Sequence, residues 1–250
     1  KMINNLSDKY TSNDIGKHWE ISEDPLSFRR LLNHLNFSTK NYEFFSIAIN
    51  RALTNSKNKD LIVVDLGAGI GWTSAIMSFD PRIKKIYVIE PTQKRIDQIK
   101  DVFKHFKCDI SKLEVIKSTF TTFKIQEKID LFVLHGSFHH CYNEDLKNMF
   151  NNIKIHLSHN SEYKFKDFLN RDISLPINSK VLISGEHYLN RYIFLWRIIK
   201  KIILKTKNKN DVDNFSGEHN RYEKEIKKIF IKNKFNYQIF NMKGDMIDPM

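Results

Sequence analysis

Three glycines at alternate positions stand where this chain could hold a nucleotide. Residues 61–66, LIVVDL, form a short apolar run rich in β-branched side chains, which predicts a buried parallel strand. Gly67, Gly69 and Gly71 follow at once, and residues 72–79 have the spacing of a helix start. Glycine lacks a Cβ and accepts unusual backbone angles, so this turn lets backbone N–H groups approach a ligand closely. We therefore predict a nucleotide cradle.

The spacing of these residues separates two kinds of nucleotide site. The dinucleotide fingerprint is G-x-G-x-x-G, whereas here the third glycine comes one position early and Trp72 stands in place of the last glycine. Asp65 lies two positions before the first glycine, and Glu90 closes a second apolar strand in the run YVIEP. A carboxylate there suits the two hydroxyls of a ribose. The chain therefore resembles the class I S-adenosylmethionine (SAM)-dependent methyltransferases, whose first motif is D/E-x-G-x-G-x-G.

This resemblance implies an α/β fold with a seven-stranded, mostly parallel sheet and helices on both faces. Residues 1–58 are then a helical N-terminal lead-in or lid, and residues 59–250 are the SAM-binding core, with a helical insertion at 188–217 after the fifth strand. We expect residues 158–179 to form a polar, irregular surface excursion and residues 235–240 to form a terminal strand.

The resemblance also implies the cofactor, SAM, with S-adenosylhomocysteine (SAH) as its product. Family members often carry an acidic residue after the third strand, beside the adenine ring, and this chain has none there. Adenine contacts would fall to hydroxyls, the backbone and Phe120. The cofactor-binding residues that we expect are Asp65, Gly67, Ala68, Gly69, Gly71, Trp72, Glu90, Pro91, Ser118, Thr119, Phe120 and His135.

Three histidines follow the fourth predicted strand, at 129–134. They are His135, His139 and His140, and in this fold the end of that strand faces the transferred methyl group. One of them, foremost His139, could act as a general base on a hydroxyl or orient an anionic oxygen. Packing over the cofactor is the structural alternative. A metal site with Glu186 and His187 is a third reading, but no recognisable ligand spacing supports it, and we predict no metal.

The absence of certain motifs from the sequence counts against several classes of methyl acceptor. There is no N/D-P-P-Y/W and no catalytic Pro-Cys, which argues against methylation of adenine N6, glutamine or cytosine C5. We expect a small anionic acceptor, phosphorylated or nucleotide-linked, methylated on oxygen during the biosynthesis of a surface polysaccharide or capsule. The residues expected to bind it are Tyr10, His18, Trp19, His187, His219, Asn220 and Arg221.

Composition leaves three other functions open. With 41 Lys+Arg against 29 Asp+Glu, the net charge of +12 favours an anionic partner, although mutational bias explains it equally well. An RNA-binding methyltransferase is one rival, but the basic stretch 197–209 is poor in aromatic residues and nucleic acid is not our expectation. A methyltransferase of a lipid or quinone, resting on a membrane through the basic amphipathic stretch 188–205, is another. A non-catalytic SAM-binding protein is the third. Two cysteines and a polar N-terminus predict a cytoplasmic protein, monomeric or homodimeric.

Overall fold

The computed structural model describes Trp19 and residues 21–53, 60–157, 162–166, 172–176, 180–184 and 223–233. Helical segments come first, as the apolar spacing predicts: α2 (Pro25–Asn33), the π-helical turn η2 (His34–Ser38) and α3 (Asn41–Leu53). Asp24 caps α2, because its carboxylate accepts a hydrogen bond from the backbone N–H of Leu26 at 3.0 Å.

Strands and helices then alternate along the chain. The core elements are β1 (Leu61–Leu66), α4 (Trp72–Ser78), β2 (Ile83–Glu90), α5 (Gln93–Phe106), the 3₁₀ turn η3 (Ile110–Lys112), β3 (Leu113–Lys117), β4 (Leu131–His135), the 3₁₀ turn η4 (Phe138–His140), α6 (Leu146–His156), β7 (Lys180–Ser184) and α8 (Glu223–Lys232). The fourth strand begins at Leu131 rather than at the predicted Ile129, which makes only an isolated bridge to Leu157.

The five-stranded sheet has the order β3-β2-β1-β4-β7, and all of its pairings are parallel. The chain runs from β1 outward to β3 and then returns to the other side of β1 with β4. Strand order therefore reverses between β1 and β4, and ligands of such sheets bind at the carboxyl ends of the strands beside that reversal. Five of the seven predicted strands lie in this sheet, and the predicted strand 235–240 lies outside the described residues.

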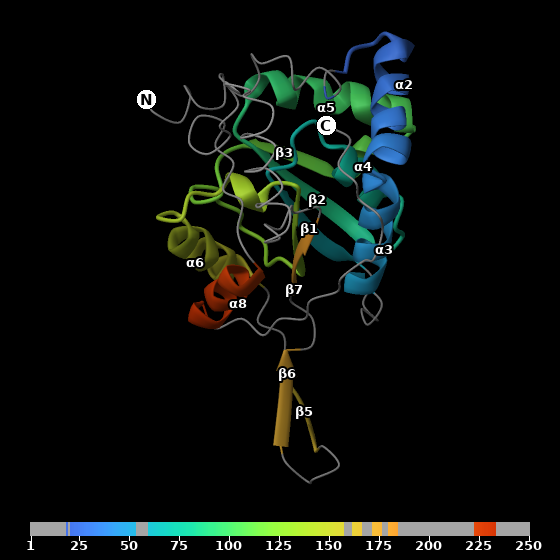
Figure 1. The fold of residues 1–250 in the computed structure, drawn as a ribbon. Helices are drawn as coiled ribbons and strands as arrows, with labels where there is room; N and C mark the ends of the chain where they lie inside the picture. The colour runs from blue at the N-terminus through green and yellow to red at the C-terminus, as the bar shows by residue number, and fades with distance from the viewer. Residues whose placement is uncertain are drawn as a thin grey trace.

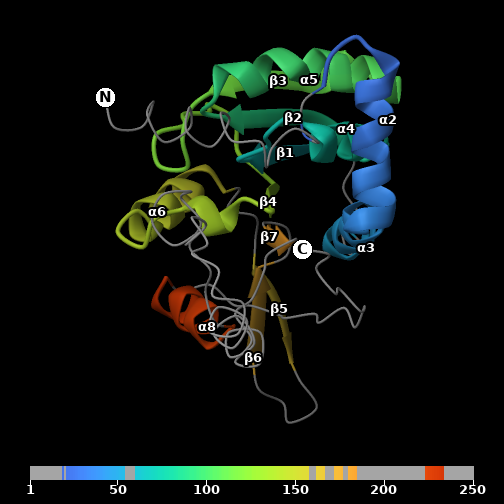
Figure 2. The same ribbon diagram turned by 45° about the horizontal axis from the view of Figure 1, so that its top comes forward.

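Two hydrophobic clusters cover the two faces of the sheet. Val63 and Val133 face a cluster shared with α2, α3, α4 and α5, whereas Val64 and Phe132 face a cluster shared with α6 and α8. Figures 1 and 2 show these two groups of helices on opposite sides of the strands. Alternate residues of one strand thus serve different layers, which is why β1 and β4 read as continuous apolar runs.

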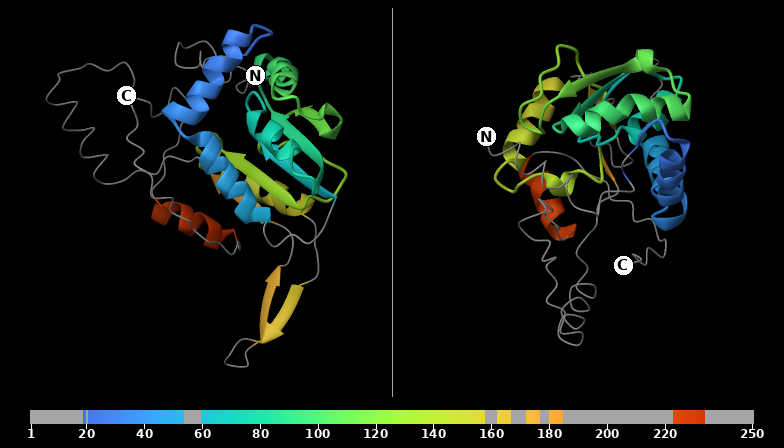
Figure 3. Two further views of the ribbon diagram at one scale, coloured as in Figure 1. Left: turned by 90° about the vertical axis from the view of Figure 1, so that its right-hand side faces the viewer. Right: turned by 90° about the horizontal axis from the view of Figure 1, so that it is seen from above.

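One prediction was wrong. Within the segment 158–179, which we expected to be irregular, the structure forms an antiparallel hairpin of β5 (Glu162–Lys166) and β6 (Asp172–Pro176). Polar and apolar residues alternate in EYKFK and DISLP, and this period of two is typical of a strand. The segment is rich in polar residues overall, and we predicted an irregular structure from that composition instead of from the alternation. Figure 3 shows the hairpin extending away from the sheet and its helices.

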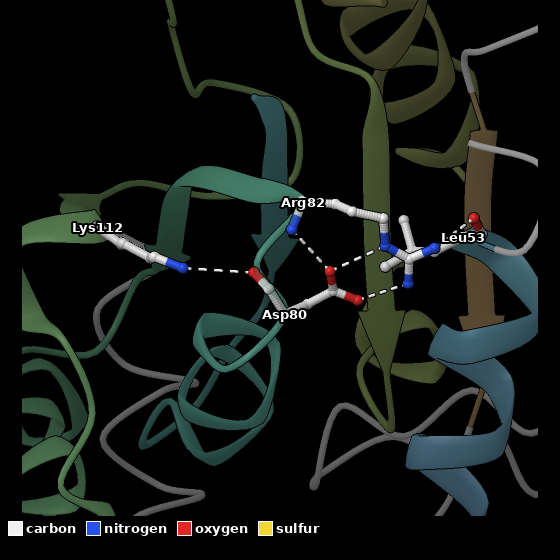
Figure 4. Close-up of polar contacts among 4 residues, drawn as sticks. All are labelled: Leu53, Asp80, Arg82 and Lys112. Atoms are coloured by element: carbon white, nitrogen blue, oxygen red, sulfur yellow. Dashed lines mark hydrogen bonds and ion pairs between the residues drawn. The ribbon is translucent and has the colours of Figure 1, made fainter. Parts of the chain in front are cut away.

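The edge of the sheet opposite the glycine turn is tied together by Asp80 and Arg82. The Asp80 carboxylate accepts hydrogen bonds from Arg82 Nε at 2.9 Å and Nη2 at 2.6 Å, and Arg82 Nη1 donates to the Leu53 carbonyl at 2.9 Å (Figure 4). Lys112 Nζ donates to the Asp80 carbonyl at 3.3 Å. These contacts join the end of α3 to the turn before β2. The predicted elements 188–205 and 206–217 lie outside the described residues, and within the described part no helix is long and apolar enough to cross a membrane.

Candidate active site

The glycine turn lies at the carboxyl end of β1, next to the strand-order reversal. Gly67 has a φ of 77°, and a Cβ built there would lie 2.8 Å from Ser137 Cβ and 3.0 Å from the ring of Phe120. Gly69 has a φ of 59°, and nothing lies within 4 Å of a Cβ built on it. The turn is therefore closed at Gly67, where only glycine fits, and open at Gly69, where a ligand can approach the backbone.

Glu90 connects the end of β2 to this turn. Its Oε2 accepts a hydrogen bond from the Gly69 N–H at 2.9 Å, and its Oε1 accepts one from the Thr92 N–H at 3.0 Å. The side chain is 2% exposed, and burial raises its pKa, while the nearby charge of Arg95 and the two backbone donors act in the opposite direction. Each carboxylate oxygen keeps a second lone pair for a hydroxyl. This donor and acceptor set fits a ribose lying over Gly69.

Asp65 lies beneath the other side of the turn, at the end of β1. Its Oδ2 accepts hydrogen bonds from the hydroxyls of Thr73 at 2.5 Å and Ser74 at 2.6 Å, both in the first turn of α4. Burial raises the pKa of Asp65 to about 6, and the two hydroxyls counter part of this increase. Asp65 therefore anchors the start of α4 to β1 and fixes the path of the glycine turn between them.

His135 ends β4 and is packed among aromatic rings. Its ring makes edge contacts with Phe45 at 4.9 Å and Trp72 at 5.1 Å between centroids, and its Nδ1 lies 2.9 Å from Ser184 Oγ. Burial lowers the pKa of His135 to about 3, and its buried Nε2 has no hydrogen-bond partner among the described residues. His135 is therefore neutral near pH 7. Its predicted catalytic and cofactor-binding roles stay predictions, and this environment favours packing and hydrogen bonding over proton transfer.

His139 and His140 lie in the 3₁₀ turn that follows β4. Their ring centroids are 4.1 Å apart, and both residues are half-buried. Ser137 leads into this turn, and its hydroxyl donates to the Leu66 carbonyl at 2.8 Å, while the His140 N–H donates to the Ser137 carbonyl at 3.0 Å. Ser137 also lies next to Gly67. The 3₁₀ turn that carries His139 and His140 therefore begins beside the glycine turn.

The other predicted site residues fall into two groups. Ser118, Thr119 and Phe120 follow β3 at the same edge of the sheet, and Pro91 follows Glu90. Trp19 packs against the N-terminal core and makes an edge contact with His34 at 4.9 Å, so its role at the acceptor stays a prediction. The remaining acceptor-binding candidates lie outside the described residues: Tyr10, His18, His187, His219, Asn220 and Arg221. No group of three metal-ligating side chains occurs in the described ranges.

Sequence reasoning missed the hydroxyls that position the Asp65 carboxylate and the His135 ring. Thr73 and Ser74 hold Asp65, and Ser184 holds His135. The available signal was the pair of hydroxyl residues directly after the glycines and Trp72, in the first turn of a helix that packs on β1. Ser184, 49 residues from His135, had no local signal because only the pairing of β4 with β7 brings it close.

Comparison with known proteins gives one family match and several similar solved structures. Residues 63–160 match the model of the methyltransferase domain family. Similar solved structures include the cyclopropane synthase MmaA2 from Mycobacterium tuberculosis, at 14% identity and a TM-score of 0.59 over 96% of this chain and 76% of that one. The YcgJ protein from Bacillus subtilis has 14% identity and a TM-score of 0.52 over 76% and 68% of the two chains. The plantazolicin methyltransferase BpumL, solved with a desmethyl plantazolicin analogue and SAH, has 16% identity and a TM-score of 0.51 over 93% and 77%. No curated protein sequence matches the chain.

The parallel sheet, the glycine turn and the two buried carboxylates define the class I methyltransferase architecture. At these identities the solved structures establish the fold alone. The match over residues 63–160 goes further, and the chain contains a class I SAM-dependent methyltransferase domain.

Proposed function

We propose that this methyltransferase transfers the methyl group to an oxygen of a small anionic acceptor, phosphorylated or nucleotide-linked, in the biosynthesis of a surface glycan. The observation that carries this proposal is the half-buried pair of His139 and His140 beside the glycine turn. Two imidazoles offer hydrogen bonds to a polar acceptor and a base for its hydroxyl. They are a poor lining for a flat, apolar acceptor such as a quinone.

SAM, when bound, supplies a methyl group on a sulfonium centre, which is displaced in line by the acceptor. The residues of this chain bind, align and exclude water. Glu90 and the glycine turn would hold the nucleoside, and His139 would take the proton from the acceptor hydroxyl as the new bond forms. Neutral His135 would hold the end of β4 against β7 through its hydrogen bond with Ser184, and it would not exchange a proton near pH 7.

Arg221 is the proposed fixed positive charge for an acceptor phosphate, because a guanidinium can donate two parallel N–H groups to phosphate oxygens. This proposal rests on the sequence order, since Arg221 lies outside the described residues. The net charge of +12 supports an anionic acceptor in a general way.

The experiment is a screen of phosphorylated and nucleotide-linked metabolites for SAM turnover, repeated with His139→Ala and Arg221→Ala. We expect His139→Ala to lower kcat/KM by about 10²- to 10⁴-fold, the usual contribution of a general base. His105→Ala and Arg29→Ala are the matched controls, because His105 stacks on Phe28 at a ring distance of 4.7 Å and Arg29 is exposed on α2. Turnover of neutral or lipid-like acceptors only, with Arg221→Ala unchanged, would reject the anionic acceptor and favour a membrane role for residues 188–205.

A further inference from the structure

The loop after β3 carries a cluster of hydroxyls next to Glu90. Residues 118–122 read STFTT, and the Ser118 N–H donates to the Glu90 carbonyl at 3.3 Å, which fixes the loop against the end of β2. β2 pairs with β3 on one side and β1 on the other. A ribose held by Glu90 therefore has the glycine turn on one side and this hydroxyl loop on the other, where the purine base would lie.

The hydroxyls of this loop bond to one another. Ser118 Oγ lies 3.0 Å from Thr122 Oγ1, and Thr119 Oγ1 lies 2.7 Å from Thr122 Oγ1 and 3.3 Å from Thr121 Oγ1. In each of these pairs either oxygen can donate. A hydroxyl carries one donor and two acceptor lone pairs, and its hydrogen rotates to suit its partner. The cluster can therefore present either an O–H or a lone pair to a ligand without moving a heavy atom.

The loop carries no charged side chain that would favour either a donor or an acceptor on the base. The segment 118–123 contains no acidic or basic residue. Ser118, Thr119 and Thr121 are half-buried and Thr122 is exposed, so water can satisfy a hydroxyl that the base leaves unpaired. A site discriminates strongly against a wrong ligand when its own buried polar groups are left without partners, and here that cost is small.

We infer that this methyltransferase does not select its cofactor by the 6-amino group of adenine and binds the inosine form, whose base is the 6-oxo purine hypoxanthine, nearly as well. Adenine offers an amino donor and a bare N1, whereas hypoxanthine offers a carbonyl acceptor and an N1–H. A carboxylate that faces position 6 would accept from the amino group and repel the carbonyl oxygen, but hydroxyls serve both. The inference rests on SAM binding with the ribose at Glu90.

The test is calorimetric binding of SAH and of S-inosyl-L-homocysteine to the full chain. We expect the two Kd values to differ by less than about tenfold, equivalent to about 1.4 kcal/mol. Installing a carboxylate with Thr119→Asp should raise the preference for SAH by at least about tenfold, and Ser118→Asp provides a second variant if the first does not fold. Ser46→Asp, on α3, is the control and should leave the ratio unchanged.

The outcomes separate this inference from the proposed function. If SAH itself does not bind, both the cofactor assignment and this inference fail. If SAH binds and the inosyl analogue binds more than about tenfold more weakly, only the inference fails. An unchanged ratio in a folded Thr119→Asp or Ser118→Asp variant would also overturn it, because the base would then lie away from this loop.

Discussion

At the scale of single residues, the predicted cofactor site contains two carboxylates withdrawn from water. Glu90 and Asp65 are only 2% and 1% exposed. Their partners are backbone N–H groups and hydroxyls. Such burial destabilises the charged form of an acid, so we expect the Glu90 carboxylate to serve the ligand rather than the stability of the fold.

Replacement of Glu90 should weaken cofactor binding directly. We expect Glu90→Gln to raise the Kd for SAM by at least about tenfold, since a charge-assisted pair of hydrogen bonds to the ribose becomes a neutral one. The measurement is isothermal calorimetry with SAM and SAH. Glu114→Gln, at an exposed glutamate of β3, is the matched control. Equal affinities in the wild type and Glu90→Gln would place the ribose elsewhere.

Asp65 should make the stability of the protein depend on pH. Its pKa is raised from 3.8 to about 6 by burial, so the folded state binds its proton more tightly than the unfolded state does. The stabilisation from the protonated form is complete below about pH 4 and is lost as the pH rises through 6. Relative to Asp65→Asn, the wild type should therefore lose on the order of 3 kcal/mol of unfolding free energy between acid and neutral pH.

Urea unfolding of both proteins across that pH range measures this difference. The comparison with Asp65→Asn removes the contributions of the other acids, because they are common to both chains. A difference in unfolding free energy that does not change with pH would show that Asp65 ionises as freely in the folded state as in the unfolded state.

His135 gives a third prediction at this scale. His135→Phe should leave the unfolding free energy unchanged or raise it by up to about 1 kcal/mol, since a ring of similar size replaces an imidazole with an unpartnered buried nitrogen but loses the bond to Ser184. His135→Ala should lower it by about 2–4 kcal/mol by leaving a cavity between Phe45 and Trp72. Chemical denaturation of both variants measures this. A large loss in His135→Phe would mean that Nε2 has a partner in solution.

Local patterns predicted the glycine turn and Glu90 because strand, turn and carboxylate follow one another within a few residues. The environment of His135 could not be predicted in this way. Phe45 comes from α3 and Ser184 from β7, about 90 residues earlier and 49 residues later in the chain, and only the packed fold brings both to β4. Burial by distant elements, rather than residue type, decides whether this histidine is charged.

At the scale of whole elements, the tie between α3 and the turn before β2 gives a testable contribution to stability. Arg82→Leu removes the hydrogen bonds to the Asp80 carboxylate and the Leu53 carbonyl, and we expect a loss of about 1–2 kcal/mol, limited by partial exposure of the pair. Thermal or urea unfolding measures the loss. The Kd for SAM should not change, because this contact lies at the opposite edge of the sheet. A variant with normal stability but weaker SAM binding would contradict this division.

Strands buried on both faces were easier to predict than strands in polar segments. β1 and β4 are buried on both faces and read as continuous apolar runs, whereas β5 and β6 alternate within a segment of mixed polarity. Hydrophobicity alone therefore recognised the first pair of strands, and the second pair needed the period of two to be weighed above composition.

At the scale of the whole molecule, the charge of +12 should produce weak and non-specific attraction to RNA. We expect a short single-stranded RNA to bind at low salt and to lose most of its affinity by about 0.2 M salt, since released counterions supply the binding energy. Fluorescence anisotropy over a salt series measures this. Binding tighter than about 1 μM at 0.15 M salt would support an RNA acceptor and contradict the small-molecule proposal.

The position of β3 has a consequence for solubility. β3 has a neighbour on one side only in the described sheet, so its other side presents unpaired backbone groups that could pair with another chain. Glu114 and Lys117 are exposed on this strand, next to an exposed Val115. Charged residues on an edge strand oppose strand-to-strand association. The opposite charges of β3 therefore protect the folded protein against aggregation through this edge.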